Sequence, residues 1–192
     1  MKSEEVKDLL EWSGAILTGH FRLTSGKHSK QYIEKFRLLE NPIALDKICS
    51  TMAEMYKDKE IDLVVSAAIG GILLAGGVGR HLNVKHIFSE RVTEKMVLRR
   101  GFNIEENYNI LIVEDIVTTG GSINELIELV EKYNANIIGI VSIVDRNDKK
   151  KIFKYSYESL LNLPTESWHK DECPDCLKKI SIIKPGSTGK NV

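Results

Sequence analysis

One stretch of the chain carries most of the residues that could do chemistry. Residues 109–127 read NILIVEDIVTTGGSINELI, in which an apolar run leads directly into Glu114 and Asp115. Neighbouring carboxylates repel each other, and each must stay hydrated or find a partner, so we expect them at the end of a strand rather than inside it. In that position they could hold the vicinal hydroxyls of a sugar.

The acids are followed by a polar loop, TTGGS, at residues 118–122. Its hydroxyls and backbone N–H groups can turn inward at the positive end of the next helix, which suits a phosphate monoester. Ser122, with Glu125 three residues later, predicts a capping box at the start of that helix. A phosphate site beside a diol site describes a ribose 5-phosphate. The alternative is an ordinary strand–turn–helix connection with a few solvated acids.

Chemistry at this position needs a sheet whose strands end together. Short, nearly continuous apolar runs alternate with helical patterns, which predicts an α/β fold with a central, mainly parallel sheet flanked by helices. Such sheets bind ligands at the carboxyl ends of their strands. The expected strands are residues 61–65, 84–88, 110–113 and 137–144, the expected helices are 71–81 and 123–133, and 89–100 is expected to be a charged loop.

The N-terminal region is expected to form a small hood over this sheet. Residues 4–12 have the spacing of a short amphipathic helix, and residues 21–36 predict a polar turn between two extended runs. Asn41 before a proline is a strong helix start, because Asn caps and Pro fits the first turn. We expect a single domain, with the hood at about 1–40, the core at about 41–150 and a C-terminal appendage at about 151–192.

The composition of the 192 residues is that of an ordinary globular protein. Lys+Arg and Asp+Glu both total 27, so no overall positive field favours nucleic acid or an anionic membrane. Three cysteines are an odd number and the N-terminus has no apolar leader, which favours the cytoplasm over a disulfide framework. Residues 63–79 carry no charge, but five of these seventeen residues are glycine, which favours a strand, a turn and a helix over a membrane span.

The string EDIVTTGGS at residues 114–122 resembles the phosphoribosyl-diphosphate signature of type I phosphoribosyltransferases. No Walker loop occurs, and residues 77–79 mimic only half of a dinucleotide fingerprint. The resemblance implies the fold of that family, Asp115 as a catalytic residue, and Mg²⁺ as a cofactor carried by the diphosphate without a direct protein ligand. The residues that it assigns to phosphoribosyl diphosphate are Glu114, Asp115, Ile116, Val117, Thr118, Thr119, Gly120, Gly121, Ser122, Arg91 and Lys95.

Two further segments indicate the acceptor. Residues 19–33, GHFRLTSGKHSKQYI, are similar to the N-terminal element of orotate phosphoribosyltransferases, and an expected strand ends at residues 144–146 with VDR. In that family an arginine here pairs with the carboxylate of orotate, which a guanidinium binds through two parallel hydrogen bonds. The resemblance therefore assigns Arg146 and Thr118 to orotate binding. It implies transfer of phosphoribosyl from 5-phospho-α-D-ribose 1-diphosphate to orotate, in UMP biosynthesis.

Two other functions stay open from the sequence. A purine-type phosphoribosyltransferase would share the donor loop, but a purine has no carboxylate to pair with Arg146. A regulator that senses phosphoribosyl diphosphate and binds nucleic acid would need an extra DNA-binding domain or a basic face. The balanced charge argues against such a face.

Residues 89–100, SERVTEKMVLRR, correspond to the mobile catalytic loop of the family. This sequence departs from the commoner form, which is longer, richer in glycine and carries several lysines and a histidine. Lys95 is the only lysine of this segment, so the resemblance assigns to it the role of the catalytic lysine of the family. Arg91, Arg99 and Arg100 are further cations for the leaving diphosphate. In the family this loop reaches into the partner subunit, which implies a homodimer with shared active sites.

The C-terminal segment holds a candidate metal motif. Cys173 and Cys176 have the C-x-x-C spacing of zinc ribbons, but the chain has no second pair to complete four ligands. His169 offers a third ligand, so a structural or dimer-shared metal is one alternative. The remaining histidines show no ligand spacing, and we expect surface or local hydrogen-bonding roles for His20, His28, His81 and His86.

Overall fold

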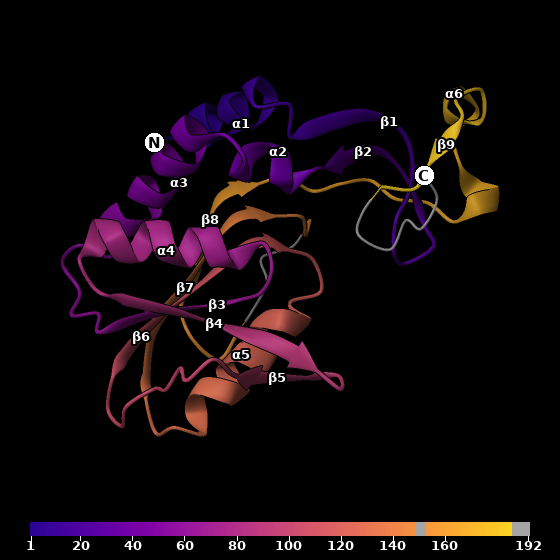
Figure 1. Cartoon of the computed structure of the whole chain (residues 1–192). Helices are drawn as coiled ribbons and strands as arrows, with labels where there is room; N and C mark the ends of the chain where they lie inside the picture. The colour runs from indigo at the N-terminus through magenta and orange to yellow at the C-terminus, as the bar shows by residue number, and fades with distance from the viewer. Residues whose placement is uncertain (149–152, 186–192) are drawn as a thin grey trace.

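The computed structural model describes residues 1–148 and 153–185, apart from the side chain of Cys176. Its main element is a sheet in the order β5-β4-β3-β6-β7-β8, in which all pairings are parallel except that of β5 with β4 (Figure 1). The strands are β3 (Leu63–Ala67), β4 (Lys85–Val92), β5 (Lys95–Leu98), β6 (Asn109–Val117), β7 (Asn136–Asp145) and β8 (Tyr157–Asn162). The expected mainly parallel α/β sheet is confirmed.

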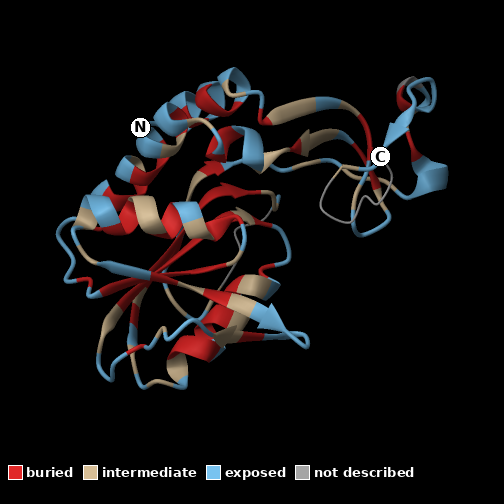
Figure 2. Ribbon diagram, viewed as in Figure 1, coloured by how far each residue is buried: buried red, intermediate tan, exposed pale blue. Residues whose placement is uncertain are grey.

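Helices cover both faces of this sheet, and the buried residues lie between the layers (Figure 2). Side chains alternate along each strand, so Val64 packs on one face and its neighbour Val65 packs on the other. One face carries α1 (Ser3–Trp12), α3 (Pro42–Glu54) and α4 (Gly71–Leu82), and the other carries α5 (Gly121–Glu131). Within the described residues, no helix combines the length and the apolar character that crossing a membrane requires.

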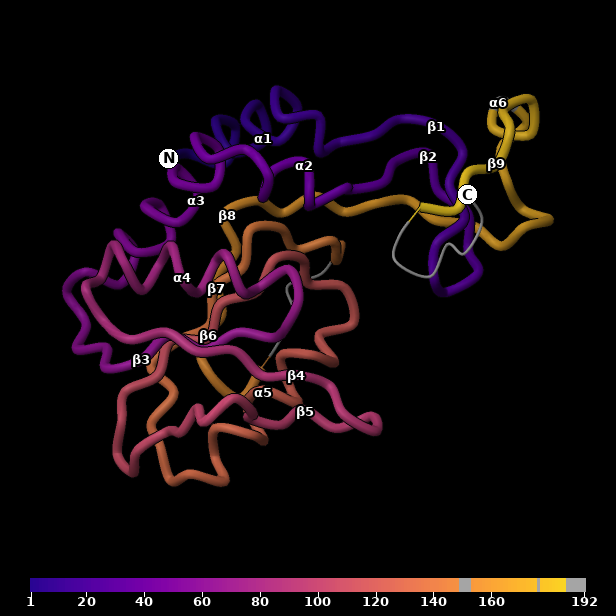
Figure 3. The backbone as a smooth tube through the Cα atoms, viewed as in Figure 1, coloured from indigo at the N-terminus to yellow at the C-terminus, as the bar shows by residue number. Residues whose placement is uncertain are grey.

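The hood contains a second sheet, in the order β2-β1-β9, that extends away from the main sheet (Figure 3). The hairpin of β1 and β2 is antiparallel, as the polar turn between extended runs predicts, and the tail returns to add β9 in parallel. Its elements are β1 (Ile16–Arg22), β2 (His28–Ile33), α2 (Lys35–Leu39), the 3₁₀ turn η1 (Lys170–Glu172), α6 (Asp175–Lys178) and β9 (Ile182–Ile183). Asn41 caps α3 by accepting two backbone hydrogen bonds at 3.0 Å, which confirms the expected helix start.

The strand that carries the acids is longer than its pattern indicates. β6 pairs with β7 as far as Val117 and Asp145, so Glu114 and Asp115 lie within the ladder. The expectation that they follow the strand is wrong, because both find partners inside the protein. β8 comes from the segment assigned to the C-terminal appendage and adds an edge strand next to β7. The division into hood, core and appendage stays a prediction.

Two other local expectations are wrong. Residues 89–100 are a hairpin instead of a loop, because β4 and β5 pair across a turn at Thr93 and Glu94, whose φ angles of 45° and 68° suit a tight hairpin. The capping box of Ser122 is absent, since α5 begins at Gly121, two residues earlier than expected, and the residue that precedes it is Gly120, which has no side chain to cap it.

We predict that one added methyl group has opposite effects at two neighbouring glycines of α4. A Cβ at Gly77 would lie 2.8 Å from the Cβ of Cys49 in α3, whereas a Cβ at Gly76 would meet His86 at 3.5 Å, an ordinary contact. Gly77→Ala should therefore destabilise the fold by about 1–3 kcal/mol through overpacking. Gly76→Ala should gain up to about 1 kcal/mol from helix propensity. Urea unfolding measures both, and equal stabilities would contradict the close packing of α3 against α4.

Candidate active site

Two buried acids form the floor of the site. Glu114 and Asp115 expose only 7% and 4% of their surfaces. The backbone N–H of Asp115 donates to Glu114 Oε1 at 3.0 Å, and that of Ile116 donates to Asp115 Oδ1 at 2.6 Å. Burial, and then the charge of Asp115, raise the pKa of Glu114 above its usual range. Glu114 therefore takes up a proton more readily than an exposed carboxylate does.

Lys35, a residue that the sequence patterns do not mark, supplies the partner of Asp115. It stands at the start of α2 in the hood, and its Nζ lies 2.6 Å from Asp115 Oδ2. A side chain at Gly70, which precedes α4, would overlap with that same oxygen and lie 3.0 Å from Lys35 Nζ. The peptide bond between Ala68 and Ile69 in this loop is cis. The hood, β6 and the start of α4 thus meet at the carboxylate of Asp115.

The loop after β6 offers groups that bind anions. Gly120 has a φ of 79°, which glycine adopts without strain, and it turns the chain into α5. No side chain caps this helix, and the hydroxyl-bearing Thr118 and Thr119 are exposed. A recess of about 50 Å³ is lined by residues 116–123 and Glu114. The backbone N–H of Gly121 donates to Thr119 Oγ1 over a long 3.5 Å, and the other N–H groups of the first turn of α5, together with these hydroxyls, suit a phosphate.

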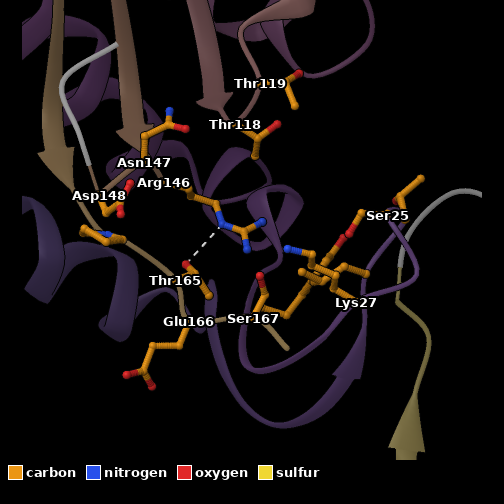
Figure 4. Close-up of a pocket in the computed structure, with 14 residues that line it drawn as sticks. Ser25, Lys27, Thr118, Thr119, Arg146, Asn147, Asp148, Thr165, Glu166 and Ser167 are labelled. Atoms are coloured by element: carbon orange, nitrogen blue, oxygen red, sulfur yellow. Dashed lines mark hydrogen bonds between the residues drawn. The ribbon is translucent and has the colours of Figure 1, made fainter. Parts of the chain in front are cut away.

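A larger cavity of about 820 Å³ opens beside this loop (Figure 4). Thr118 and Thr119 line both the recess and the cavity, so the two hollows adjoin each other. The hood contributes Lys27 and Tyr32, and residues 164–167 after β8 close another side. A molecule with a phosphate and a planar ring therefore has room to place the phosphate in the recess and the ring in the cavity.

Arg146 directs its guanidinium into this cavity. It follows β7, and its backbone N–H donates to the carbonyl oxygen of Val117 at 3.0 Å, which ties it to the end of β6. Its Nε donates to Thr165 Oγ1 at 3.1 Å, while its two terminal nitrogens bond to none of the described residues (Figure 4). Burial lowers the pKa of Arg146. A desolvated guanidinium with a free fork is suited to a carboxylate.

The hairpin cations lie elsewhere in the same chain. Lys95 is exposed at the start of β5 and does not line the cavity. Arg91 pairs with Glu125 of α5 at 2.8 Å and also donates to the backbone carbonyl of Glu94 at 3.1 Å. Arg99 and Arg100 likewise pair with a glutamate of β4. The structure thus brings residues 114–122 and Arg146 together, but it does not bring Lys95 or Arg91 to them within one chain.

One cluster of potential metal ligands occurs in the described part of the chain, and it lies outside this cavity. His20, His28 and Cys173 bring their ligand atoms within 4.8 Å of one another. Of the two roles expected for His20 and His28, surface or local hydrogen bonding, the structure shows the second, because both are buried and their rings hydrogen-bond to each other at 2.8 Å. His169, the third ligand that the sequence offers beside Cys173, is exposed and is not part of this cluster.

A family model described as a phosphoribosyl transferase domain matches residues 36–175. The chain belongs to the phosphoribosyltransferase family. It is 45% identical over 187 residues to the orotate phosphoribosyltransferase of Thermoanaerobacter sp. (strain X514), and the match covers 97% of this chain and 98% of that protein.

Two solved structures show the same fold. The orotate phosphoribosyltransferase of Aeropyrum pernix superposes with a TM-score of 0.70 at 22% identity, covering 82% of this chain and 93% of that one. The adenine phosphoribosyltransferase of Thermoanaerobacter pseudethanolicus superposes with a TM-score of 0.66 at 18% identity, covering 84% and 100%. The expected type I phosphoribosyltransferase fold is confirmed. Since the two neighbours are named for different bases, the fold alone does not select the acceptor.

We predict that Lys35 and Asp115 depend on each other for stability. Lys35→Met leaves a buried carboxylate without its partner and should cost about 1–3 kcal/mol, below the range for fully buried pairs because the Lys35 side chain is 33% exposed. Adding Asp115→Asn should recover most of that loss. Chemical denaturation of the two single variants and the double variant measures the coupling.

Lys57→Met is the matched control, because Lys57 pairs with Glu54 on the surface, and it should change stability by well under about 1 kcal/mol. Strictly additive effects at Lys35 and Asp115 would show that the ion pair does not hold the hood to β6.

Proposed function

We propose that this chain is an orotate phosphoribosyltransferase. It transfers phosphoribosyl from 5-phospho-α-D-ribose 1-diphosphate to orotate and yields orotidine 5'-phosphate and diphosphate, a step of pyrimidine biosynthesis. The observation that carries the proposal is the free, half-buried guanidinium of Arg146 beside the anion loop at residues 118–122. The near full-length similarity to a protein named for this activity supports the choice of base.

The donor binds at the carboxyl end of β6. Residues 118–122 hold the 5-phosphate with their hydroxyls and with the N–H groups at the start of α5. Glu114 and Asp115 contact the ribose hydroxyls, since they lie just before this loop. Glu114, whose pKa is raised, can then donate as well as accept a hydrogen bond. Strand β3 is the neighbour of β6, and helix α4, which follows β3 and begins at Gly71, offers a second helix N-terminus to the diphosphate.

The acceptor occupies the larger cavity. Arg146 binds the orotate carboxylate through its two terminal nitrogens, while Thr165 fixes the plane of the guanidinium through Nε. Thr118 lies at the junction of recess and cavity, where donor and acceptor meet. A purine would leave the buried guanidinium unpaired, which disfavours the purine-type alternative.

The chemistry consists mainly of positioning and charge. The bond between ribose C1 and the diphosphate oxygen breaks, and its electron pair leaves with the diphosphate. The orotate ring nitrogen bonds to the same carbon, and its proton passes to the departing diphosphate. Asp115 favours the positive charge that develops on the ribose in the transition state. The positive charge of Lys95 stabilises the negative charge that develops on the leaving diphosphate. Holding both reactants at one sheet edge lowers the entropic part of the barrier.

Mg²⁺ fits this site as an ion carried by the diphosphate. Of the two buried acids at the floor of the site, Asp115 already pairs with the ammonium of Lys35, and burial favours the protonated form of Glu114. Magnesium typically keeps substrate phosphate oxygens and water as ligands rather than an all-protein cage. When bound, the ion neutralises charge on the leaving group.

The same proposal includes a cytoplasmic homodimer with shared sites. Lys95 and Arg91 lie on an exposed hairpin away from the cavity of their own chain, so a second chain is needed to bring such cations to the diphosphate. The free, buried thiol of Cys49 fits a reducing compartment.

Arg146→Ala should lower kcat/KM for orotate by roughly 30-fold or more, because the buried carboxylate loses a bidentate partner worth about 2–5 kcal/mol. Arg146→Lys should recover little of this, since it keeps the charge but not the fork. Donor affinity should stay close to native, because residues 118–122 bind the phosphate independently. Initial rates and calorimetric titration of the donor measure both quantities.

Arg37→Ala is a matched control, because Arg37 lies exposed in the hood and pairs with Glu40. If Arg146→Ala turns over orotate like Arg37→Ala, the assignment of orotate to the cavity fails.

Mixing two inactive variants tests the shared site. Lys95→Ala and Asp115→Asn damage different residues, so a mixed dimer carries one site in which both are intact. Part of the native activity should return after subunit exchange. Exchange is verified separately by mass spectrometry of the mixed dimers. Mixed dimers without activity would mean that Lys95 does not serve the partner's site.

A further inference from the structure

Three potential metal ligands from three separate segments meet in the hood. His20 of β1, His28 of β2 and Cys173 after η1 expose 3%, 4% and 5% of their surfaces. Imidazole nitrogen and thiolate sulfur are the ligands of structural zinc sites. The proposed transferase chemistry uses none of the three, so the cluster needs a separate explanation.

The distances between the ligand atoms are close to those of a zinc site. His20 Nε2 lies 2.8 Å from His28 Nδ1 and 3.7 Å from Cys173 Sγ. Tetrahedral zinc would set about 3.4 Å between two nitrogens and about 3.6 Å between nitrogen and sulfur. The sulfur is therefore already at the required separation from His20 and lies within 4.8 Å of the ligand atom of His28, and the two rings need to part by roughly half an ångström.

A hydrogen bond to a backbone carbonyl orients His20 as a potential metal ligand. Its other ring nitrogen, Nδ1, lies 3.1 Å from the carbonyl oxygen of Ile180 and donates to it, which leaves a lone pair on Nε2. Metal-binding histidines are held in this way by a backbone carbonyl. That single lone pair faces both the ring of His28 and the thiol of Cys173. A metal ion satisfies all three groups at once, with one bond to each.

Apart from Leu177, which is buried, the large apolar side chains of the tail that carries Cys173 are exposed. Ile180, Ile182 and Ile183 are 46%, 51% and 53% exposed, and β9 pairs with β1 over two residues. A bound metal commonly replaces a core in elements of this size. A recess of about 540 Å³ is lined by His20, His28 and Cys173 and gives an ion a path from the surface.

We propose that His20, His28 and Cys173 bind one structural zinc ion that fastens the tail to the hairpin of β1 and β2. Cys173 loses its thiol proton on binding and coordinates as a thiolate. The C-x-x-C spacing offers Cys176 as the fourth ligand, but its side chain lies outside what the structure describes, so the site rests on the other three. The ion would also steady the turn that carries Lys27 to the edge of the cavity.

Metal analysis of the tag-free, full-length protein, purified without chelator, tests the site. We expect about one zinc per chain in the native protein and in His169→Ala, the exposed matched control. Cys173→Ala and His28→Ala should each lower zinc affinity by roughly tenfold or more. Removing zinc with a chelator should lower the Tm, and adding zinc back should restore it. None of these measurements depends on transferase activity, so they stand apart from the proposed function.

Cobalt substitution keeps the test valid if a variant does not fold. The native protein loaded with Co²⁺ should show a thiolate-to-cobalt charge-transfer band together with the visible absorption of a tetrahedral ion. If the metal-free protein takes up no zinc when zinc is titrated into it, the proposal is overturned. Zinc retained in full by folded Cys173→Ala would also overturn it, as would a cobalt spectrum without the charge-transfer band.

Discussion

Two adjacent carboxylates inside a sheet are the constraint on which the rest of the site depends. Glu114 and Asp115 lie in β6 between β3 and β7, where water cannot satisfy them. Lys35 reaches from the hood to pair with Asp115, and Gly70 leaves room for the contact. The buried charge of Asp115 therefore holds the hood against β6, and the cavity lies between the hood and the ends of the strands.

The parallel register of β6 and β7 then brings the two anion-binding groups together. Val117 lies opposite Asp145, so the next residues, Thr118 and Arg146, begin neighbouring loops. One edge of the sheet thus presents an uncapped helix start, suited to a phosphate, and a guanidinium, suited to a carboxylate. Two fixed anion sites are enough to orient a phosphorylated donor and an acidic acceptor toward each other.

Local patterns in the sequence predict the sheet and the anion loop, because both depend on neighbouring residues. Lys35 could not be predicted in this way, since its partner Asp115 is distant in the chain and no periodic pattern links them. The expected strand at residues 110–113 is too short for the same reason. Glu114 and Asp115 can stay in the hydrogen-bonded ladder of β6 because they have partners inside the protein, and the partner Lys35 is not visible in the local pattern. His20 and His28 likewise meet only through the pairing of β1 with β2, which leaves no ligand spacing in the sequence.

Turnover by the native protein tests most directly whether this sheet edge joins orotate to phosphoribosyl diphosphate. The loss of orotate absorbance is followed with the donor and Mg²⁺ present, and released diphosphate is measured in parallel. We expect one diphosphate to be released for each orotate consumed, and no reaction when the donor is left out. Uracil, which lacks the carboxylate, should be turned over only slowly. Turnover of adenine, hypoxanthine or guanine in place of orotate would contradict the role of Arg146, and the absence of turnover with every base would contradict the donor site as well.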